Sequence, residues 1–211
     1  MLRSVVVIAA AVTMALAPVD AQRRPARKAP ARQAPLTKSI AAVKCPALLG
    51  TGVKTARIFC DVPAGRDPAD GVIVTIPPHT GTATLSFDLH ARHTYSEAET
   101  RAGRAFSQYM AVIGVLSMKG DLISRAAIQT EFRSAASLFD RISGGAGPNG
   151  LKAVAPVGVE QVYVTVPAGL TEVSLLGETL DASTPAGHET VVLPGRPVAI
   201  VSNVQVEYRK K

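Results

Sequence analysis

Residues 106–133, FSQYMAVIGVLSMKGDLISRAAIQTEFR, decide the fold class. Lys119-Gly120-Asp121 is the signal of a tight turn, because glycine readily adopts the positive φ that such turns need. After this turn, apolar and polar side chains alternate: Leu122, Ala126, Ile128 and Phe132 fall on one face, and Arg125, Gln129, Glu131 and Arg133 on the other, with Ile123 as the exception. This period of two is typical of a strand with one face in water. The stretch before the turn, 109–118, is apolar on both faces, which predicts a central or covered strand.

Short apolar stretches separated by Pro/Gly turns continue this pattern from residue 39 onward. The strands that the sequence predicts are 55–62, 71–77, 82–90, 105–118, 121–133, 137–142, 151–156, 160–167, 171–177, 188–193 and 197–208. No stretch has a capped helical period, although 96–104 allows one helical turn. Many short strands of this kind predict an all-β fold, an antiparallel β-sandwich that is Ig-like or jelly-roll-like.

The glycine-rich sequence GGAGPNG at 144–150 is the strongest internal break. A domain boundary at this point would leave a second unit of about 60 residues with no disulfide, which is short for an independent core. We therefore predict one domain over residues 39–211 that contains a long loop.

The first 21 residues have the three parts of a secretory signal peptide. A basic start precedes an apolar run at 4–17, and Val19-Asp20-Ala21 then offers a small residue at the cleavage site. The alternative is an uncleaved anchor, but the apolar run is shorter than the roughly 20 residues that a spanning helix needs. We therefore predict an exported bacterial protein in the periplasm, at the cell surface or in the medium.

Residues 22–38 predict a disordered linker, because they are rich in Ala, Arg and Pro and contain little that can form a core. The simplest interpretation is a tether. The alternative is electrostatic adhesion to an anionic envelope surface through five cations, which are Arg23, Arg24, Arg27, Lys28 and Arg32.

The net charge of +7 resembles that of a nucleic-acid-binding protein, but its distribution argues against that class. Seven of the 23 cations precede Ser39, and the rest of the chain is close to neutral. A basic face for nucleic acid is therefore not predicted. The two cysteines, Cys45 and Cys60, predict a disulfide, since an oxidising compartment would pair them.

One polar cluster is a candidate binding or metal site. Its candidate residues are His79, Asp88, His90, His93, Tyr95 and Glu97. The alternative without a functional site is a strand that leaves the core for a polar loop, with Asp88, His90 and Arg92 on its solvated face. A third possibility is a ligand-binding or partner-binding loop over 88–104, because such sites commonly lie on the loops of a rigid sandwich.

The set His90, His93 and Glu97 resembles part of the cupin metal motif, which also occurs on a jelly roll. That family separates its first two histidines by one residue, so that both point into the barrel. In this chain two residues intervene, which sets His90 and His93 on opposite faces of a regular strand. Membership of that family is therefore not inferred.

The sequence contains no G-x-S-x-G, P-loop or H-E-x-x-H pattern, and no G-x-G-x-x-G between a strand and a helix, so it indicates no particular reaction and no required cofactor. We predict a non-enzymatic interaction or structural module of the envelope, with a protein or polysaccharide partner. The alternatives are a metal-binding protein or enzyme that uses His79, Asp88, His90 and His93, and a carbohydrate-binding module. The latter usually stacks sugars on aromatic rings, for which the chain offers no Trp and only Tyr95 and Tyr163 as candidates.

Overall fold

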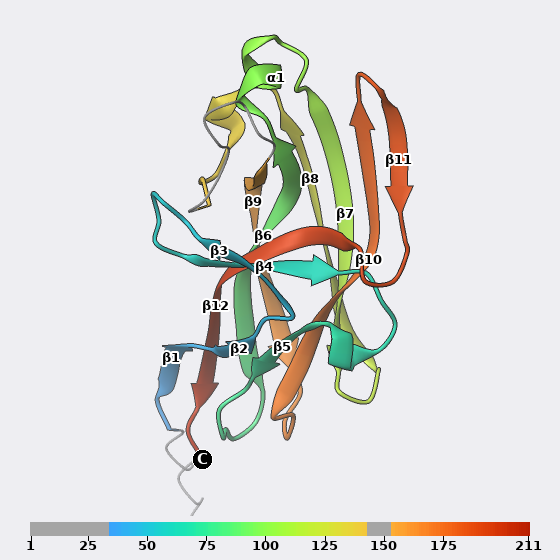
Figure 1. The fold of residues 1–211 in the computed structure, drawn as a ribbon. Coiled ribbons are helices and arrows are strands. Elements are labelled where there is room, and N and C mark those ends of the chain that lie inside the picture. Colours follow the sequence, from blue (N-terminus) through green and yellow to red (C-terminus); the bar gives the residue numbers. More distant parts are fainter. Residues whose placement is uncertain (1–33, 143–152) are drawn as a thin grey trace, which may run out of the picture. The chain divides into compact units, whose positions relative to one another are not determined.

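A computed structural model describes residues 34–142 and 153–211. These residues form two six-stranded sheets that pack face to face, and every pairing between the named strands is antiparallel (Figure 1). The predicted all-β sandwich is therefore confirmed. The predicted signal peptide and most of the predicted linker lie outside the described residues, as does the GGAGPNG loop.

Sheet A has the strand order β3-β4-β12-β6-β9, and β1 also pairs with β12. Its strands are β1 (Leu36–Ile40), β3 (Ala47–Thr51), β4 (Ile58–Pro63), β6 (Ala83–Tyr95), β9 (Ala153–Val166) and β12 (Pro197–Arg209). On one side of β12, β4 pairs with its first half and β1 with its second half. This leaves residues 202–204 of β12 between the two partners, which is where the groove described below lies.

Sheet B has the order β2-β5-β10-β7-β8, and β11 also pairs with β10. Its strands are β2 (Ala42–Lys44), β5 (Val72–Thr75), β7 (Ser107–Ser117), β8 (Leu122–Phe132), β10 (Glu172–Thr184) and β11 (Gly187–Val191). The hairpin from which the fold was predicted is β7–β8, and Gly120 in its turn has a φ of 89°. The strand expected to lie centrally, β7, is paired on both sides, by β8 and β10.

Two predicted strands, 151–156 and 160–167, are one strand in the structure. β9 runs through both, and Gly158 (φ 64°) lies at a shift in its register with β6. A bulge of this kind bends a strand without ending it. The predicted strand at 137–142 is wrong, because a short 3₁₀ turn at Ala135–Ser137 leads into a loop there. The single helical turn allowed within 96–104 is confirmed as α1 (Glu97–Arg101).

The strands β1, β2 and β3 were not predicted, and β1 begins inside the predicted linker. The sequence predicts no strand at Leu36–Ile40, because only the two end residues of this segment are apolar. In the structure it is a strand because β12 supplies a partner over five residues, from Leu36 opposite Arg209 to Ile40 opposite Gln205. The linker therefore ends before Leu36 rather than at residue 38.

The main core lies between the sheets, where buried aliphatic and aromatic side chains from both inner faces meet. Leu85, Phe87 and Leu89 of β6 and Ile113 and Val115 of β7 are among its members. A second, smaller apolar cluster of Phe59, Ile142 and Ile200 lies apart from it, and Leu49, Phe139 and Val154 pack against this cluster. The second cluster covers side chains of β6 that the sequence assigned to solvent.

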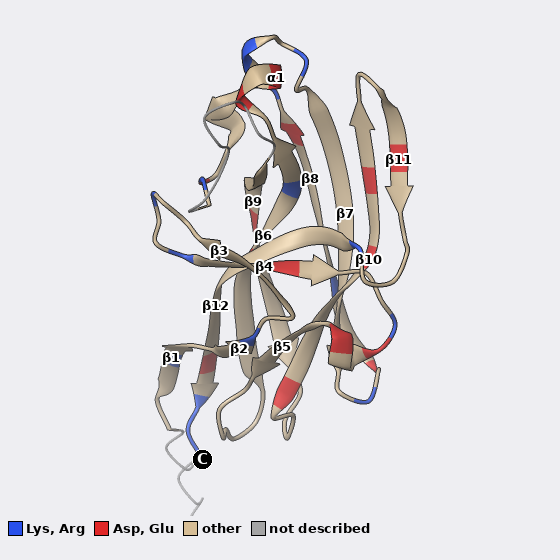
Figure 2. Ribbon diagram, in the orientation of Figure 1, with Lys and Arg blue, Asp and Glu red and all other residues tan. Residues whose placement is uncertain are grey.

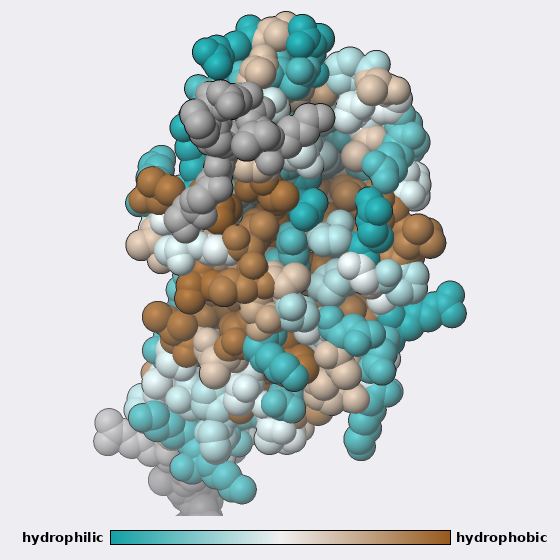
Figure 3. Space-filling view, in the orientation of Figure 1, coloured by the Kyte–Doolittle hydropathy of each residue, from teal (hydrophilic) through white to brown (hydrophobic). Residues whose placement is uncertain are grey.

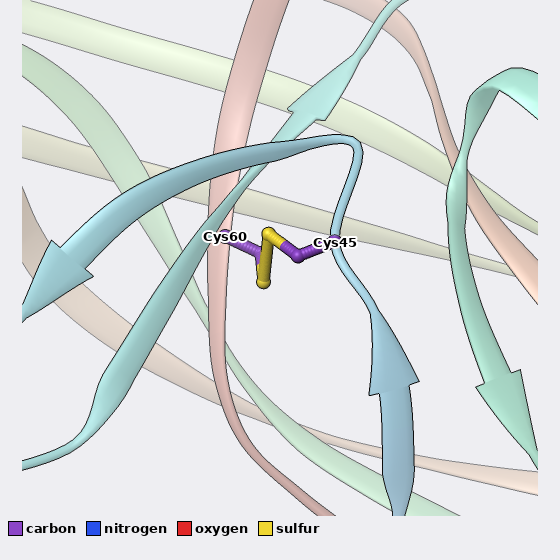
Figure 4. Close-up of a disulfide and its surroundings, with 2 residues drawn as sticks. All are labelled: Cys45 and Cys60. Atoms are coloured by element: carbon purple, nitrogen blue, oxygen red, sulfur yellow. A yellow bond between two sulfur atoms is a disulfide. The ribbon is translucent and has the colours of Figure 1, made fainter.

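The predicted disulfide between Cys45 and Cys60 is present, with the two Cα atoms 5.7 Å apart. Figure 4 shows the bridge between the segment that follows β2 and strand β4. Because β2 is the edge strand of sheet B and β4 lies next to the edge strand β3 of sheet A, the bridge links the two sheets near their edges. Among the described residues, no helix is long and apolar enough to cross a membrane.

Candidate functional site

The four residues proposed as a metal or catalytic cluster do not come together. His79 lies opposite Lys210, whereas His90 lies opposite Ile200, near the other end of β12. Ten residues of extended strand separate these positions by roughly 30 Å. The Nδ1 atom of His79 instead donates to the carbonyl of Pro77 at 2.9 Å. Within residues 34–142 and 153–211, no group of three or more His, Cys, Asp or Glu side chains is placed to hold a metal ion.

His90 and His93 lie on opposite faces of β6, as the sequence predicted. His93 is in the main core, where its ring stacks on Phe132 at 3.9 Å between centroids and its Nδ1 is hydrogen-bonded to the hydroxyl of Tyr109. Burial lowers the pKa of His93 to about 4, so the imidazole is neutral at pH 7. Tyr95 is buried beside it, whereas Glu97 is exposed at the start of α1.

The solvated-face interpretation of Asp88, His90 and Arg92 is wrong. His90 is fully buried, and Asp88 is only 5% exposed. The cover comes from residues distant in sequence: the ring of Phe139 lies 4.6 Å from the His90 ring, and that of Phe59 lies 5.6 Å from it. The alternation of polar residues along β6 was therefore real, but a second apolar layer hides the polar face.

The buried polar side chains on this face pair with one another. Arg92 forms an ion pair with Asp61, with 3.0 Å between Nε and Oδ1, and Arg57 forms one with Asp88, with 2.5 Å between Nη1 and Oδ2. Burial raises the pKa of Asp61, although the contact with Arg92 acts in the opposite direction. These pairs compensate the charges that the apolar layer would otherwise leave unpaired.

His90 makes two hydrogen bonds at this buried face. Its Nδ1 lies 2.6 Å from the carbonyl oxygen of Gly158, and its Nε2 lies 2.9 Å from the hydroxyl oxygen of Ser202. A carbonyl can only accept, so Nδ1 carries the proton and Nε2 accepts from Ser202. Burial lowers the pKa of His90 and outweighs the Gly158 bond, which raises it, so the ring stays neutral.

This Ser–His pair has the hydrogen bonding of a nucleophile and its base. However, Ser202 is only 1% exposed, so its hydroxyl is out of reach of a substrate in this structure. A register shift in β12 beside Ser202, where Asn203 has a φ of 53°, and the bulge at Gly158 place the two hydrogen-bonding partners around His90. The arrangement satisfies a buried imidazole and thereby fixes the local structure.

A groove opens next to this polar row, at the gap between β1 and β4. It has a volume of about 590 Å³ and is lined by residues between Ile40 and Cys45, by Leu48, by residues between Ala56 and Cys60, and by residues 201–204 of β12. The disulfide cysteines form part of the lining. Its polar members are Arg57, Asn203 and Ser202, of which Ser202 is only 1% exposed. We call this feature the edge groove.

Three large aliphatic side chains project into water around the edge groove. Ile40 is 85% exposed, Leu48 66% and Ile58 62%. Figure 3 shows apolar side chains gathered over β3, β4 and the segment that joins β1 to β2. Single exposed apolar residues are ordinary, but a group of them around a concave surface is a candidate interaction site.

Several cations lie around this groove. Lys38 lies two residues before Ile40, Lys44 lies between the lining residues Val43 and Cys45, and Arg57 lines the groove itself. Figure 2 shows basic positions on β2 and toward the end of β12, near the same margin. The acids on this side include Asp61, which is paired with Arg92, Asp88, which is paired with Arg57, and Glu207, which lies opposite Lys38.

Little in the sequence predicted this surface. Ile40 and Leu48 lie on strands that were not predicted, and Ile58 was expected to be an ordinary strand residue. One usable signal was the short Cys45–Cys60 loop, which carries several aliphatic residues with no regular period. Of the two aromatic platforms considered for sugar binding, Tyr163 is 61% exposed, whereas Tyr95 is buried.

No protein-family model matches the sequence, and no curated protein matches it at a significant level. Among solved structures, the chain is similar to the K1 cleaved adhesin domain of Lys-gingipain from Porphyromonas gingivalis W83, with 11% identity and a TM-score of 0.34 over 83% of this chain and 91% of that chain. It is also similar to the VP2 subviral particle of infectious bursal disease virus, with 10% identity and a TM-score of 0.27 over 83% of this chain and 32% of that chain. At these scores neither likeness bears on function.

Proposed function

We propose that this chain is an exported, non-enzymatic interaction module of the bacterial cell envelope, and that it binds an apolar segment of a partner protein in the edge groove. The observation that carries the proposal is the exposure of Ile40, Leu48 and Ile58 around a concave surface of about 590 Å³. Such a surface combines an apolar contact area with a shape that a protruding segment can fill.

The energetics favour a covered groove. Fully burying one aliphatic side chain of this size is worth about 1.5–3 kcal/mol. Three such side chains at the centre of one contact can therefore supply several kcal/mol, which is the range that the dominant residues of an interface contribute. Ile40, Leu48 and Ile58 would be the residues whose loss weakens the complex most.

The disulfide supports export, because such bonds persist in oxidising compartments. The predicted signal peptide supports it independently. Adhesion of the linker through Arg23, Arg24, Arg27, Lys28 and Arg32 to an anionic envelope surface belongs to the same proposal, and it would hold the domain near its partner.

A non-enzymatic role is supported by how the polar groups next to the groove are used. Asp61 and Asp88 are each paired with an arginine, and the hydroxyl of Ser202 is buried against His90. These groups stabilise the wall of the groove rather than project into it.

Binding of the neutral apolar dye Nile red by the purified exported protein tests the proposal. We expect one saturable site whose dissociation constant rises at least about tenfold in the double variant Ile40→Ser, Ile58→Ser. The matched control is Val192→Ser, Leu193→Ser, which removes two exposed aliphatic side chains located in the loop before β12. Equal dye binding by both double variants and the parent protein would exclude the edge groove as the apolar site.

A further inference from the structure

We propose that the partner binds as an added β-strand on the free edge of β1, and that β1 selects a strand with the pattern apolar–x–acidic–x–apolar. This inference rests on the proposed function, since Ile40 belongs both to β1 and to the edge groove. It specifies how the partner segment is recognised and which residues it carries.

The backbone of β1 offers an open edge. Among the described strands, β1 pairs only with β12, which occupies one of its two edges. The N–H and C=O groups that point away from β12 have no strand partner in the described part of the chain. Figure 1 shows β1 at the margin of sheet A beside the end of β12. An open edge of this kind is a template for a strand from another chain.

The side chains of β1 define what that strand should carry. Leu36, Lys38 and Ile40 alternate along the strand, so they share one face, and all three are exposed. An added strand would place three alternate side chains directly beside them. Apolar residues opposite Leu36 and Ile40, and an acid opposite Lys38, give favourable pairs at all three positions.

The charge at the centre of β1 argues against a second copy of this chain as the occupant. Antiparallel pairing of two β1 strands about their middle would set Lys38 opposite Lys38, and directly opposed like charges destabilise a sheet. On its other side Lys38 faces Glu207 of β12. A carboxylate from the partner would therefore extend a row in which charges alternate across the strands.

In this proposal, apolar contacts in the edge groove supply the affinity, and backbone pairing with β1 sets the register of the bound strand. A strand that pairs with β1 and continues past Ile40 reaches the exposed side chains of Leu48 and Ile58 on the far side of the groove. Backbone hydrogen bonds in such a complex are independent of sequence, whereas alternate side chains confer specificity. An extended peptide meets both requirements, whereas an acyl chain supplies no backbone groups.

Synthetic peptides test this recognition on the purified exported protein. The probe is Thr-Val-Thr-Glu-Thr-Val-Thr with blocked ends, and the matched peptide has Lys in place of Glu. We expect the Glu peptide to bind at least about tenfold more tightly than the Lys peptide at low salt, and the difference to shrink as salt is added. Two further versions of the Glu peptide carry N-methyl groups on alternate residues, so that each version blocks one edge of the strand. Only the version blocked on the edge that pairs with β1 should lose binding.

Variants at Lys38 show whether β1 is the site. Lys38→Glu should reverse the preference between the two peptides, and Lys38→Gln should abolish it, with unchanged thermal midpoints as the check on folding. The same peptide preference in all three proteins would overturn the proposal, as would equal binding by both N-methylated peptides. If neither peptide binds while Nile red still distinguishes the groove variants, strand addition at β1 is excluded and the groove stands. If Nile red does not distinguish the groove variants either, the proposed function is excluded as well.

Discussion

Asp140 binds Thr55 through both the backbone and the side chain of that residue. Its Oδ2 accepts from the amide nitrogen of Thr55 at 2.9 Å and from the hydroxyl at 2.5 Å, and its Oδ1 accepts from the amide of Lys54. The two loops are 85 residues apart in sequence. One carboxylate therefore ties the loop that carries Phe139 to the β3–β4 turn, beside the edge groove.

Replacing this carboxylate should loosen both loops. We expect Asp140→Ala to lower the free energy of unfolding by about 2 kcal/mol, because several charge-assisted hydrogen bonds are lost together. Urea denaturation measures the change. The control is Asp67→Ala. The Asp67 side chain accepts one exposed hydrogen bond, from the amide of Ala69, and its loss should lower the free energy of unfolding by less than about 1 kcal/mol. Equal effects of the two substitutions would contradict the role of Asp140.

Acid should destabilise the protein through its two buried imidazoles. Burial holds the pKa of His93 at about 4, below its ordinary value of 6.5, and also lowers that of His90. As pH falls from 6.5 toward 4, the unfolded chain takes up protons that the folded chain does not, so the free energy of unfolding falls. Each imidazole contributes up to about 1.4 kcal/mol per pH unit.

Removing one imidazole tests this linkage. We expect His93→Phe, which keeps a flat ring against Phe132, to reduce the pH slope of stability between pH 6.5 and 4, because the largest contribution that one imidazole makes to this slope is then lost. The measurement is urea denaturation at a series of pH values. An unchanged slope in the variant would show that His93 does not titrate as its burial requires.

The disulfide should stabilise the domain. It closes a loop of 15 residues, for which loop-closure entropy predicts about 3 kcal/mol. Replacing Cys45 and Cys60 together with Ser should cost that amount in urea denaturation. Adding reductant should destabilise the parent protein similarly and leave the double variant unaffected, and a reductant effect on the variant would show that another process is responsible.

Gly177 should tolerate no side chain. A Cβ at this position would lie 2.3 Å from Cγ2 of the buried Val198 and 3.0 Å from the carbonyl oxygen of Pro63, where β10 passes close to β4 and β12. We expect Gly177→Ala to cost about 1–3 kcal/mol in urea denaturation. At Gly114 the nearest atom is the end of the flexible Glu178 side chain, at 3.2 Å, so Gly114→Ala should cost clearly less. A larger loss at Gly114 would contradict this packing.

The fold class was predictable because the strands that define it carry their own pattern. In β8 the alternation from Ala126 to Phe132 indicates which face is wet, although Leu122, expected on the buried face, is 46% exposed, and Gly120 lies in the turn. The strand β1 carries no such signal, because its pairing with β12 joins residues about 170 positions apart. Tertiary pairing alone makes Leu36–Ile40 a strand.

The candidate site was less predictable, because burial on the outer face of sheet A depends on a remote loop. The sequence placed Asp88 and His90 correctly on one face of β6, but nothing in their neighbourhood shows that Phe139 covers them. The groove has the same origin. Ile40, Leu48 and Ile58 come together only because β1, β3 and β4 converge around the disulfide and the gap along β12.

Site-specific photocrosslinking in the exporting cell tests the central claim most directly. With p-benzoylphenylalanine in place of Leu48, we predict a discrete protein adduct that disappears when Ile58→Glu is added. The same photoreactive residue in place of Leu193, which is as exposed as Leu48 at 65%, should give no such adduct. Identical adducts from the two positions, or an adduct from Leu48 that survives Ile58→Glu, would contradict the assignment of the edge groove as the binding surface.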